Sequence, residues 1–127
     1  MKLIDVKLIG ATDGNGDATL TSERAVFGFL DKLIWVENTL ANNADGVLTV
    51  LNPSSGVAET LFTFTDVNAD TPFYPRTLVH GLTKTALTGT AGGDRTRLLV
   101  AGELQLVISD GGDTKNGGCV AYILEND

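Results

Sequence analysis

The chain has 127 residues, which is enough for one domain whose hydrophobic core needs no metal or disulfide support. Apolar residues make up 43% of the chain and charged residues 20%, a composition that excludes an intrinsically disordered protein. Sixteen acidic residues outnumber nine basic ones, the net charge is −7, and the scattered lysines and arginines argue against nucleic-acid binding.

The single cysteine, Cys119, excludes an intrachain disulfide and favours assembly in a reducing cytoplasm. The start of the chain carries Asp5 and Lys7, so it lacks the uninterrupted apolar stretch of a signal peptide. No apolar run reaches the length of a membrane span, and we therefore expect no membrane partner. Residues 1–127 are predicted to form a single domain.

Residues 2–9 alternate imperfectly between apolar and polar side chains and are predicted to form a strand. We expect its inward side chains to be Leu3, Val6 and Leu8. The turn-forming sequence DGNGD at residues 13–17 follows this strand, and its composition predicts a hairpin loop.

The same loop also imitates the first half of a calcium-binding loop, in which oxygen atoms at alternate positions converge on one ion. The imitation fails further along, because Ala18 stands where such loops need glycine and Arg24 where they need a bidentate glutamate. A plain hairpin loop is therefore favoured over a calcium site.

Residues 26–36 fit two patterns. Their apolar positions match one face of a helix, with Val26, Phe27, Leu30, Leu33 and Ile34. Gly28 in the interior and the β-favouring sequence at 33–36 argue for a strand instead, and we predict a strand. Trp35 is predicted to lie in the core, with a partner surface as the alternative.

The middle of the chain predicts a hairpin. Residues 38–46 form a polar loop, residues 47–51 form a strand, and a proline and glycine turn leads to a second strand at 59–65. Residues 66–75 hold two of the three prolines, which suit a loop or a sheet edge. The long polar segment 83–96 is typical of an interaction loop or a mobile one.

Residues 97–124 predict a second antiparallel hairpin, with a glycine-rich loop at 110–118. Apolar residues recur at every second position on both sides of that loop, and we expect these to be the buried ones: Leu104, Leu106, Ile108, Val120, Tyr122 and Leu124. The Ala-Gly-Glu sequence at 101–103 predicts a bulge or bend. Seven or eight strands without a helix predict an all-β antiparallel β-sandwich, with a jelly roll as one form of it.

No residue pattern points to catalysis. His80 is the only histidine, and no other histidine or cysteine lies close to it in sequence to complete a zinc site. Cys119 alternates with Ala121 and Ile123, which places it on a strand face as a small apolar side chain. We therefore expect no enzyme activity, no metal and no cofactor. Sugar binding is the alternative for a small ligand, through aromatic side chains at Trp35, Phe73 and Tyr74.

Three segments resemble a bacteriophage structural family. They are FYPRTLVH at residues 73–80 with the following loop TGTAGG at 88–93, the sequence SDGGDTKNGGCVAYIL at 109–124, and NADGVLTV at 43–50. The resemblance covers the chain from about Gly28 onward. It implies a small virion protein similar to capsid decoration or cement proteins, which assemble in the host cytoplasm and sit on the outer surface of the head shell.

The resemblance further implies a homo-trimer whose partner is the major capsid protein and whose weak contacts combine to stabilise the shell. The alternatives are a tail or head-tail connector component and a carbohydrate-binding module that aids adsorption. Arg76 and His80 are expected to order the loop at 72–81 or to form an intersubunit contact, or else only to pin their own loop. The full set of interface candidates is Tyr74, Arg76, His80, Asp94, Arg95 and Lys115.

Overall fold

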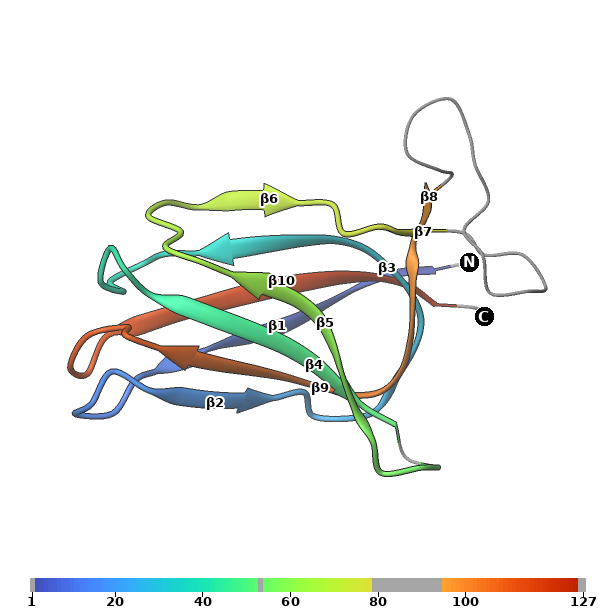
Figure 1. Ribbon diagram of the computed structural model, residues 1–127, viewed down its shortest axis with the longest axis horizontal. Coiled ribbons are helices and arrows are strands. Elements are labelled where there is room, and N and C mark those ends of the chain that lie inside the picture. Colours follow the sequence, from blue (N-terminus) through green and yellow to red (C-terminus); the bar gives the residue numbers. More distant parts are fainter. Residues whose placement is uncertain (1, 53, 79–94, 126–127) are drawn as a thin grey trace.

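The computed structural model describes residues 2–52, 54–78 and 95–125, and every regular element in them is a strand (Figure 1). The strands are β1 (Lys2–Ala11), β2 (Ala18–Thr21), β3 (Val26–Val36), β4 (Asp45–Leu51), β5 (Ala58–Phe64), β6 (Thr71–Phe73), β7 (Thr77–Leu78), β8 (Arg95–Thr96), β9 (Leu98–Ser109) and β10 (Asn116–Glu125). The all-β prediction is confirmed. Within these ranges, no helix is long and apolar enough to cross a membrane.

Eight strands form one antiparallel sheet in the order β1-β10-β3-β9-β4-β5, with β2 also paired to β9 and β6 to β3. Strand β9 belongs to both halves of this sheet, because residues 98–102 pair with β3 and residues 103–109 pair with β4. The change of partner falls at the predicted bend at 101–103, which is confirmed. Because β9 joins the halves, a sandwich of two separate sheets or a jelly roll is not established.

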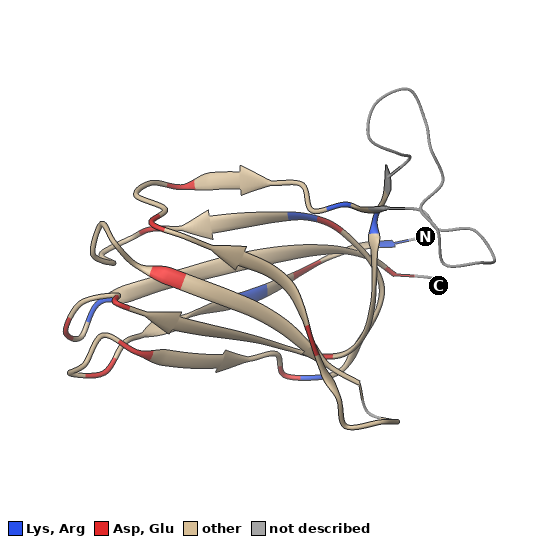
Figure 2. Ribbon diagram, viewed as in Figure 1, with Lys and Arg blue, Asp and Glu red and all other residues tan. Residues whose placement is uncertain are grey.

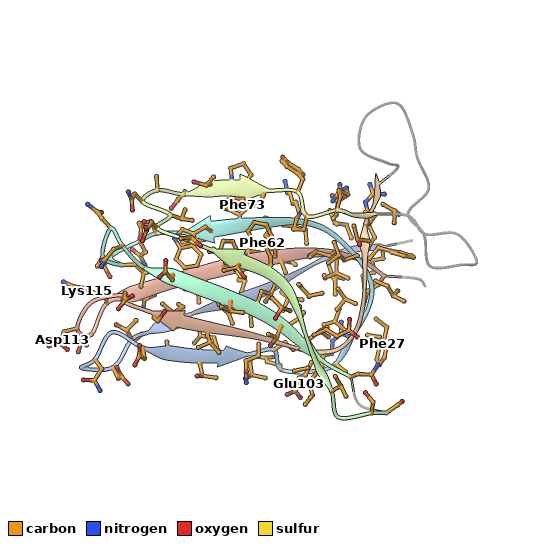
Figure 3. All side chains as sticks on the ribbon, in the orientation of Figure 1. Phe27, Phe62, Phe73, Glu103, Asp113 and Lys115 are labelled. Carbon is orange, nitrogen blue, oxygen red and sulfur yellow. The ribbon has the colours of Figure 1, made fainter. Side chains whose placement is uncertain are left out.

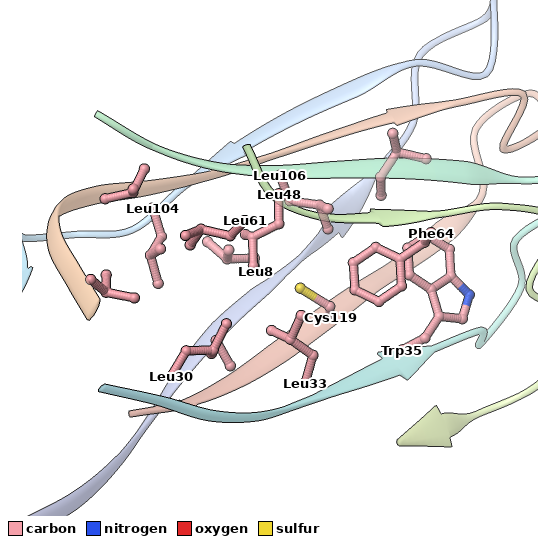
Figure 4. Close-up of a cluster of buried hydrophobic side chains, with 14 of the residues drawn as sticks. Leu8, Leu30, Leu33, Trp35, Leu48, Leu61, Phe64, Leu104, Leu106 and Cys119 are labelled. Atoms are coloured by element: carbon pink, nitrogen blue, oxygen red, sulfur yellow. The ribbon is translucent and has the colours of Figure 1, made fainter. Parts of the chain in front are cut away.

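The two halves of the sheet turn their apolar faces toward each other, and the core lies between them (Figure 4). Trp35 and Phe64 are buried, with ring centroids 4.8 Å apart. Phe62 and Phe73 extend this aromatic cluster, with centroids 5.0 Å apart. The prediction that Trp35 lies in the core is confirmed.

Strand β3 occupies the predicted range, and one irregularity explains why its sequence also fits a helix. The register of β10 on β3 shifts so that Tyr122 faces Lys32 and Ile123 faces Leu30, which leaves Asp31 without a partner on β10. This bulge lets Leu30 and Leu33 both point into the core although they are three residues apart. A spacing of three in a bulged strand matches the spacing of a helical face.

The predicted hairpin at 47–65 is confirmed by the antiparallel pairing of β4 with β5. Strand β6 follows this hairpin in the sequence. It is short, contains Pro72 and, among the described strands, pairs only with β3. Its edge position agrees with the expectation from proline, which cannot donate to a neighbouring strand.

The predicted hairpin at 97–124 is wrong. Strand β10 lies between β1 and β3, whereas the second part of β9 lies between β2 and β4, so residues 110–115 connect the two halves of the sheet. The predicted hairpin loop at 13–17 is wrong for the same reason, because β1 pairs with β10 and β2 pairs with β9. Alternation of apolar residues sets which face is buried but not which strand is the neighbour.

Two predictions of buried faces also need correction. On β10 the fully buried side chains are Cys119, Ala121 and Ile123, whereas the expected set, Val120, Tyr122 and Leu124, is only half-buried on the outer face. On β1 the inward side chains are Ile4, Val6 and Leu8, and Leu3 is 53% exposed. Both strands carry apolar residues on both faces, so alternation alone does not distinguish the inner face from the outer one. The expectations for Leu104, Leu106, Ile108 and Cys119 are confirmed.

Candidate functional site

One end of the molecule gathers four connections, and most of the acidic residues among the described ranges lie there (Figure 2). We call these loops, at 12–17, 37–44, 65–70 and 110–115, together with Asp45 at the start of β4, the acidic end. It carries Asp13, Asp17, Glu37, Asp45, Asp66, Asp70, Asp110 and Asp113, against Lys115 alone. The eight acidic residues and one lysine of the acidic end sum to −7, which equals the net charge of the chain, because the remaining eight acidic and eight basic residues balance in number.

Thr12 locks two loops of the acidic end together. Its side chain is 4% exposed, and its Oγ1 donates to the carbonyl oxygen of Gly112 at 2.6 Å and accepts from the backbone N–H of Lys115 at 2.8 Å. The backbone N–H of Gly111 donates to the carbonyl oxygen of Gly16 at 2.9 Å. These contacts join residues about a hundred positions apart, and so they hold the 12–17 and 110–115 loops together.

Replacing Thr12 with valine removes the hydroxyl and leaves two partly buried backbone groups, the carbonyl of Gly112 and the N–H of Lys115, without this partner. We expect Thr12→Val to lower the free energy of unfolding by about 1–3 kcal/mol. Chemical denaturation measures this change, and Thr12→Ser, which keeps the hydroxyl, is the matched control. If Thr12→Val is as stable as the wild type, the side chain does not hold the loops.

Asp13 organises its own loop through hydrogen bonds to the backbone. Its Oδ1 accepts from the backbone N–H groups of Asn15 at 2.8 Å and Asp17 at 3.0 Å. These hydrogen bonds, first the one from Asp17 and then that from Asn15, lower the pKa of Asp13 below its ordinary value of 3.8. No group of three potential metal-binding side chains occurs among the described residues.

The lowered pKa of Asp13 gives the loop a pH dependence. A carboxylate whose pKa is lower in the folded state stabilises the fold above its unfolded pKa, and this contribution is lost as the pH falls through the folded value. We therefore expect amide hydrogen exchange of the 13–17 loop to quicken below about pH 3.8 relative to the intrinsic rate. Asp13→Asn is expected to lose this pH dependence, and an unchanged dependence in that variant would exclude Asp13 as its source.

Glu37 is a second carboxylate of the acidic end with a distinctive environment. Desolvation by burial and the nearby negative charge of Asp70 raise the pKa of Glu37, and the Trp35 indole partly opposes this change. The backbone N–H of Glu37 donates to Asp70 Oδ1 at 2.9 Å. This contact ties the β5–β6 connection to the end of β3.

At the bulge of β3, Asp31 binds two arginines. Arg97 Nε donates to Asp31 Oδ1 at 2.8 Å, and Arg76 Nη2 lies 3.8 Å from the same oxygen. Arg76 Nη1 also donates to the backbone carbonyl oxygens of Asp31 at 2.9 Å and Pro75 at 2.7 Å. These contacts agree with the alternative that Arg76 pins its own loop, here to the bulge of β3.

Arg76→Ala is expected to lower the free energy of unfolding by about 1 kcal/mol, because the half-buried guanidinium loses its backbone acceptors and a partly screened ion pair. Thermal and chemical denaturation of the isolated protein give this value, and Arg24→Ala, at a more exposed ion pair with Glu125, is the comparison. An unchanged free energy of unfolding in the isolated variant would show that these contacts of Arg76 do not stabilise the fold.

The outer face of the sheet exposes a row of apolar side chains across four neighbouring strands. The register aligns Leu3 with Leu124, Leu124 with Phe29, and Phe29 with Leu99. Phe27 lies two residues from Phe29 in β3 and therefore on the same face. The exposed fractions are 53% for Leu3, 56% for Phe27, 38% for Phe29 and 65% for Leu99. We call this group the apolar row.

The interface candidates from the sequence do not form one patch. Tyr74 is exposed near Arg76, whereas Lys115 lies in a loop of the acidic end. Arg95 lies in β8, which pairs with β7. His80 and Asp94 lie outside the described residues. The apolar row was not predicted from the sequence. Phe27, Phe29 and Leu99 alternate with buried residues, but this alternation does not show whether the second face of a strand is exposed or covered.

The aromatic residues considered for sugar binding are also separated. Trp35 is fully buried and Phe73 packs in the aromatic cluster, so Tyr74 is the one of the three whose ring is largely exposed. The thiol of Cys119 is buried, and desolvation raises its pKa to about 12. A nucleophilic thiol needs a lowered pKa, so Cys119 is an inert core side chain.

No protein-family model matches the chain, and neither curated proteins nor solved structures show a match to it.

Proposed function

We propose that this chain is a virion structural protein that docks on the head shell of a bacteriophage, with the major capsid protein as its partner. The observation that carries the proposal is the apolar row, a set of large side chains left exposed on a regular sheet face. Contiguous apolar side chains on a protein surface are typical of contact sites. The resemblance of the sequences at 73–80 and 109–124 to a bacteriophage structural family suggests that the partner is a capsid protein.

The charge distribution supports docking through this face. The acidic end holds the whole net charge, whereas the strands that bear the apolar row belong to the charge-balanced part of the chain. Phe27 lies at the opposite end of the molecule from Asp113 and Lys115 (Figure 3). A partner that covers the row therefore meets little net charge, and the acidic end stays solvated, where it repels unwanted neighbours.

The rigidity of the fold supports a structural role for the protein. Thr12 and the loops around it are held by long-range hydrogen bonds, and the core runs through both halves of the sheet. A rigid partner loses little conformational entropy on binding, so modest contacts suffice when many copies bind one lattice. Each bound copy then stabilises the assembled shell by mass action.

The proposal is tested by adding purified protein to shells prepared without it and measuring bound protein after sedimentation. We expect the variants Phe27→Ser and Leu99→Ser to bind at least tenfold more weakly than the wild type, as for interface residues at a contact centre. Val57→Ser is the matched control, because Val57 is 58% exposed but lies in the β4–β5 turn. If all three variants bind shells as tightly as the wild type, the proposal that the apolar row docks on the shell is wrong. Binding to isolated tails rather than to shells would assign the chain to the tail.

A further inference from the structure

One edge of strand β1 is not paired with any other strand that the structure describes, and we call it the free edge. Among the described strands β1 pairs only with β10, over ten consecutive residue pairs without a bulge or proline. Its other edge opens to a groove of about 760 Å³ lined by residues 2–7 and 21–24 and by Val26. Long, regular edge strands readily pair with another chain unless something covers them. This groove leaves the inward side chains of Ile4 and Val6 only partly buried, whereas Leu8 is 1% exposed.

The sequence of β1 is complementary to itself when reversed. Around Val6 it reads Leu-Ile-Asp-Val-Lys-Leu-Ile, so apolar residues flank the centre symmetrically and one acidic residue mirrors one basic residue. Leu3, Asp5, Lys7 and Ile9 are exposed on the outer face, and the first and last of these are large apolar side chains. Nothing within the described part of one chain accounts for that exposure.

We propose that the free edge of β1 pairs antiparallel with β1 of a second copy of this chain, about a twofold axis at Val6. In this register Asp5 lies opposite Lys7 of the partner subunit, and Lys7 lies opposite Asp5 of the partner subunit. Leu3 lies opposite Ile9 of the partner subunit on the same face. Cross-strand pairs of opposite charge and of apolar residues are those that stabilise a sheet.

Other registers are disfavoured by the same residues. When β1 pairs with β1 of a second copy about a twofold axis, residues opposite each other must point to the same side of the sheet. An alternative alignment of the two strands must therefore shift the sum of the paired residue numbers by two. One such step places Asp5 opposite Asp5 of the partner subunit, and the opposite step places Lys7 opposite Lys7 of the partner subunit. Like charges directly opposite each other are destabilising. The charges therefore select the register centred on Val6.

This pairing goes beyond the virion role and does not depend on it. It joins copies in pairs through an isologous contact, in which the same surface is used on both subunits. The apolar row ends at Leu3, so pairing continues it onto Ile9 of the partner subunit. A closed trimer requires a different, head-to-tail contact.

Mass measurement by analytical ultracentrifugation tests the pairing in the isolated protein. We expect the wild type to show twice the 13.3 kDa mass of one chain. Asp5→Lys and Lys7→Asp, each of which brings like charges together, are expected to weaken dimerisation roughly tenfold or more. The double variant D5K/K7D restores opposite charges and is expected to restore the dimer. Glu59→Lys and Lys115→Asp change the net charge equally at exposed sites elsewhere and are the controls.

Disulfide trapping tests the register itself. Only Val6 faces its own copy, so Val6→Cys is expected to form a covalent dimer on oxidation, because directly opposed residues come within disulfide reach. Ile4→Cys is the control on the same face, since the two introduced thiols would lie about four residues, or roughly 13 Å, apart along the strands. Circular dichroism of each variant verifies that it is folded.

The outcomes separate the pairing from the virion proposal. A monomeric wild type, a trimer, a dimer that the β1 charge reversals leave unchanged, or equal trapping at Ile4 and Val6 would each overturn the pairing. None of these results bears on binding of the chain to shells. Conversely, a failure of shell binding with an intact, charge-dependent dimer would overturn the docking proposal and leave the β1 contact in place.

Discussion

Replacing Trp35 with alanine is expected to lower the free energy of unfolding by about 3–5 kcal/mol, one of the two largest effects that we expect from a single substitution. The indole is fully buried and packs against Phe64, which in turn contacts Phe62 and Phe73. Truncation leaves a cavity between the two halves of the sheet, which the surrounding strands cannot close without losing their pairing. The cluster therefore couples β3, β5 and β6.

Circular dichroism during chemical denaturation measures the effect of Trp35→Ala, since the variant loses its only tryptophan. Tyr74→Ala is the matched control, because Tyr74 is 59% exposed and its removal is expected to change stability by less than about 0.5 kcal/mol. A loss below about 1 kcal/mol in Trp35→Ala would mean that the core does not depend on this cluster.

The second large effect is expected at Gly118 in β10, which lies directly against the backbone of β1. Its φ is +151°, and a Cβ atom at this position would overlap the carbonyl oxygen of Leu8 on the neighbouring strand. Because the obstacle is backbone, the two strands must separate to admit an alanine. We expect Gly118→Ala to lower the free energy of unfolding by about 3 kcal/mol or more, from backbone strain and steric overlap together.

Gly56→Ala separates these two contributions. Gly56 also has a positive φ, +71°, but no atom lies within 4 Å of the position of an added Cβ. Its substitution is expected to cost about 1 kcal/mol, from backbone strain alone. Denaturation curves for both variants test the comparison. Similar losses in the two variants would show that the approach of β1 to β10 is not a steric constraint.

Much of the fold follows from local patterns. The strand at 26–36, the hairpin at 47–65 and the bend at 101–103 were predictable, because each depends on residues close in sequence. The neighbours of the last strand were not. Residues 110–115 have the composition of a hairpin loop, yet they cross between the two halves of the sheet. Glycine and aspartate allow the chain to reverse its direction, but they do not specify with which strand the next strand pairs.

The candidate sites were predicted less well than the fold, for a physical reason. The intersubunit role of Arg76 stays a prediction, and its contacts with Asp31 depend on a bulge that shifts the register of β3 on β10. The apolar row arises because register places Leu3, Phe29 and Leu99 in line across separate strands. Contacts of this kind depend on strand order, which a single sequence does not encode in any short segment.

The acidic end and the apolar row differ in chemical character and lie in different parts of the molecule. Eight carboxylates lie in or beside four loops, two of which Thr12 joins. The charge-balanced part of the chain offers an exposed sheet face and, at β1, an edge with which no other described strand pairs. A molecule built in this way presents one acidic end and one exposed apolar face. This asymmetry suits a protein that coats a larger assembly in many copies.

The most direct test of the proposed role is the number of copies of this chain in purified virions, determined by quantitative mass spectrometry against the major capsid protein. A head-shell protein predicts copies on the order of hundreds per particle, in a fixed ratio to the capsid protein. Its absence from purified virions would contradict the virion role, and a handful of copies per particle would move the chain from the shell to the tail or connector.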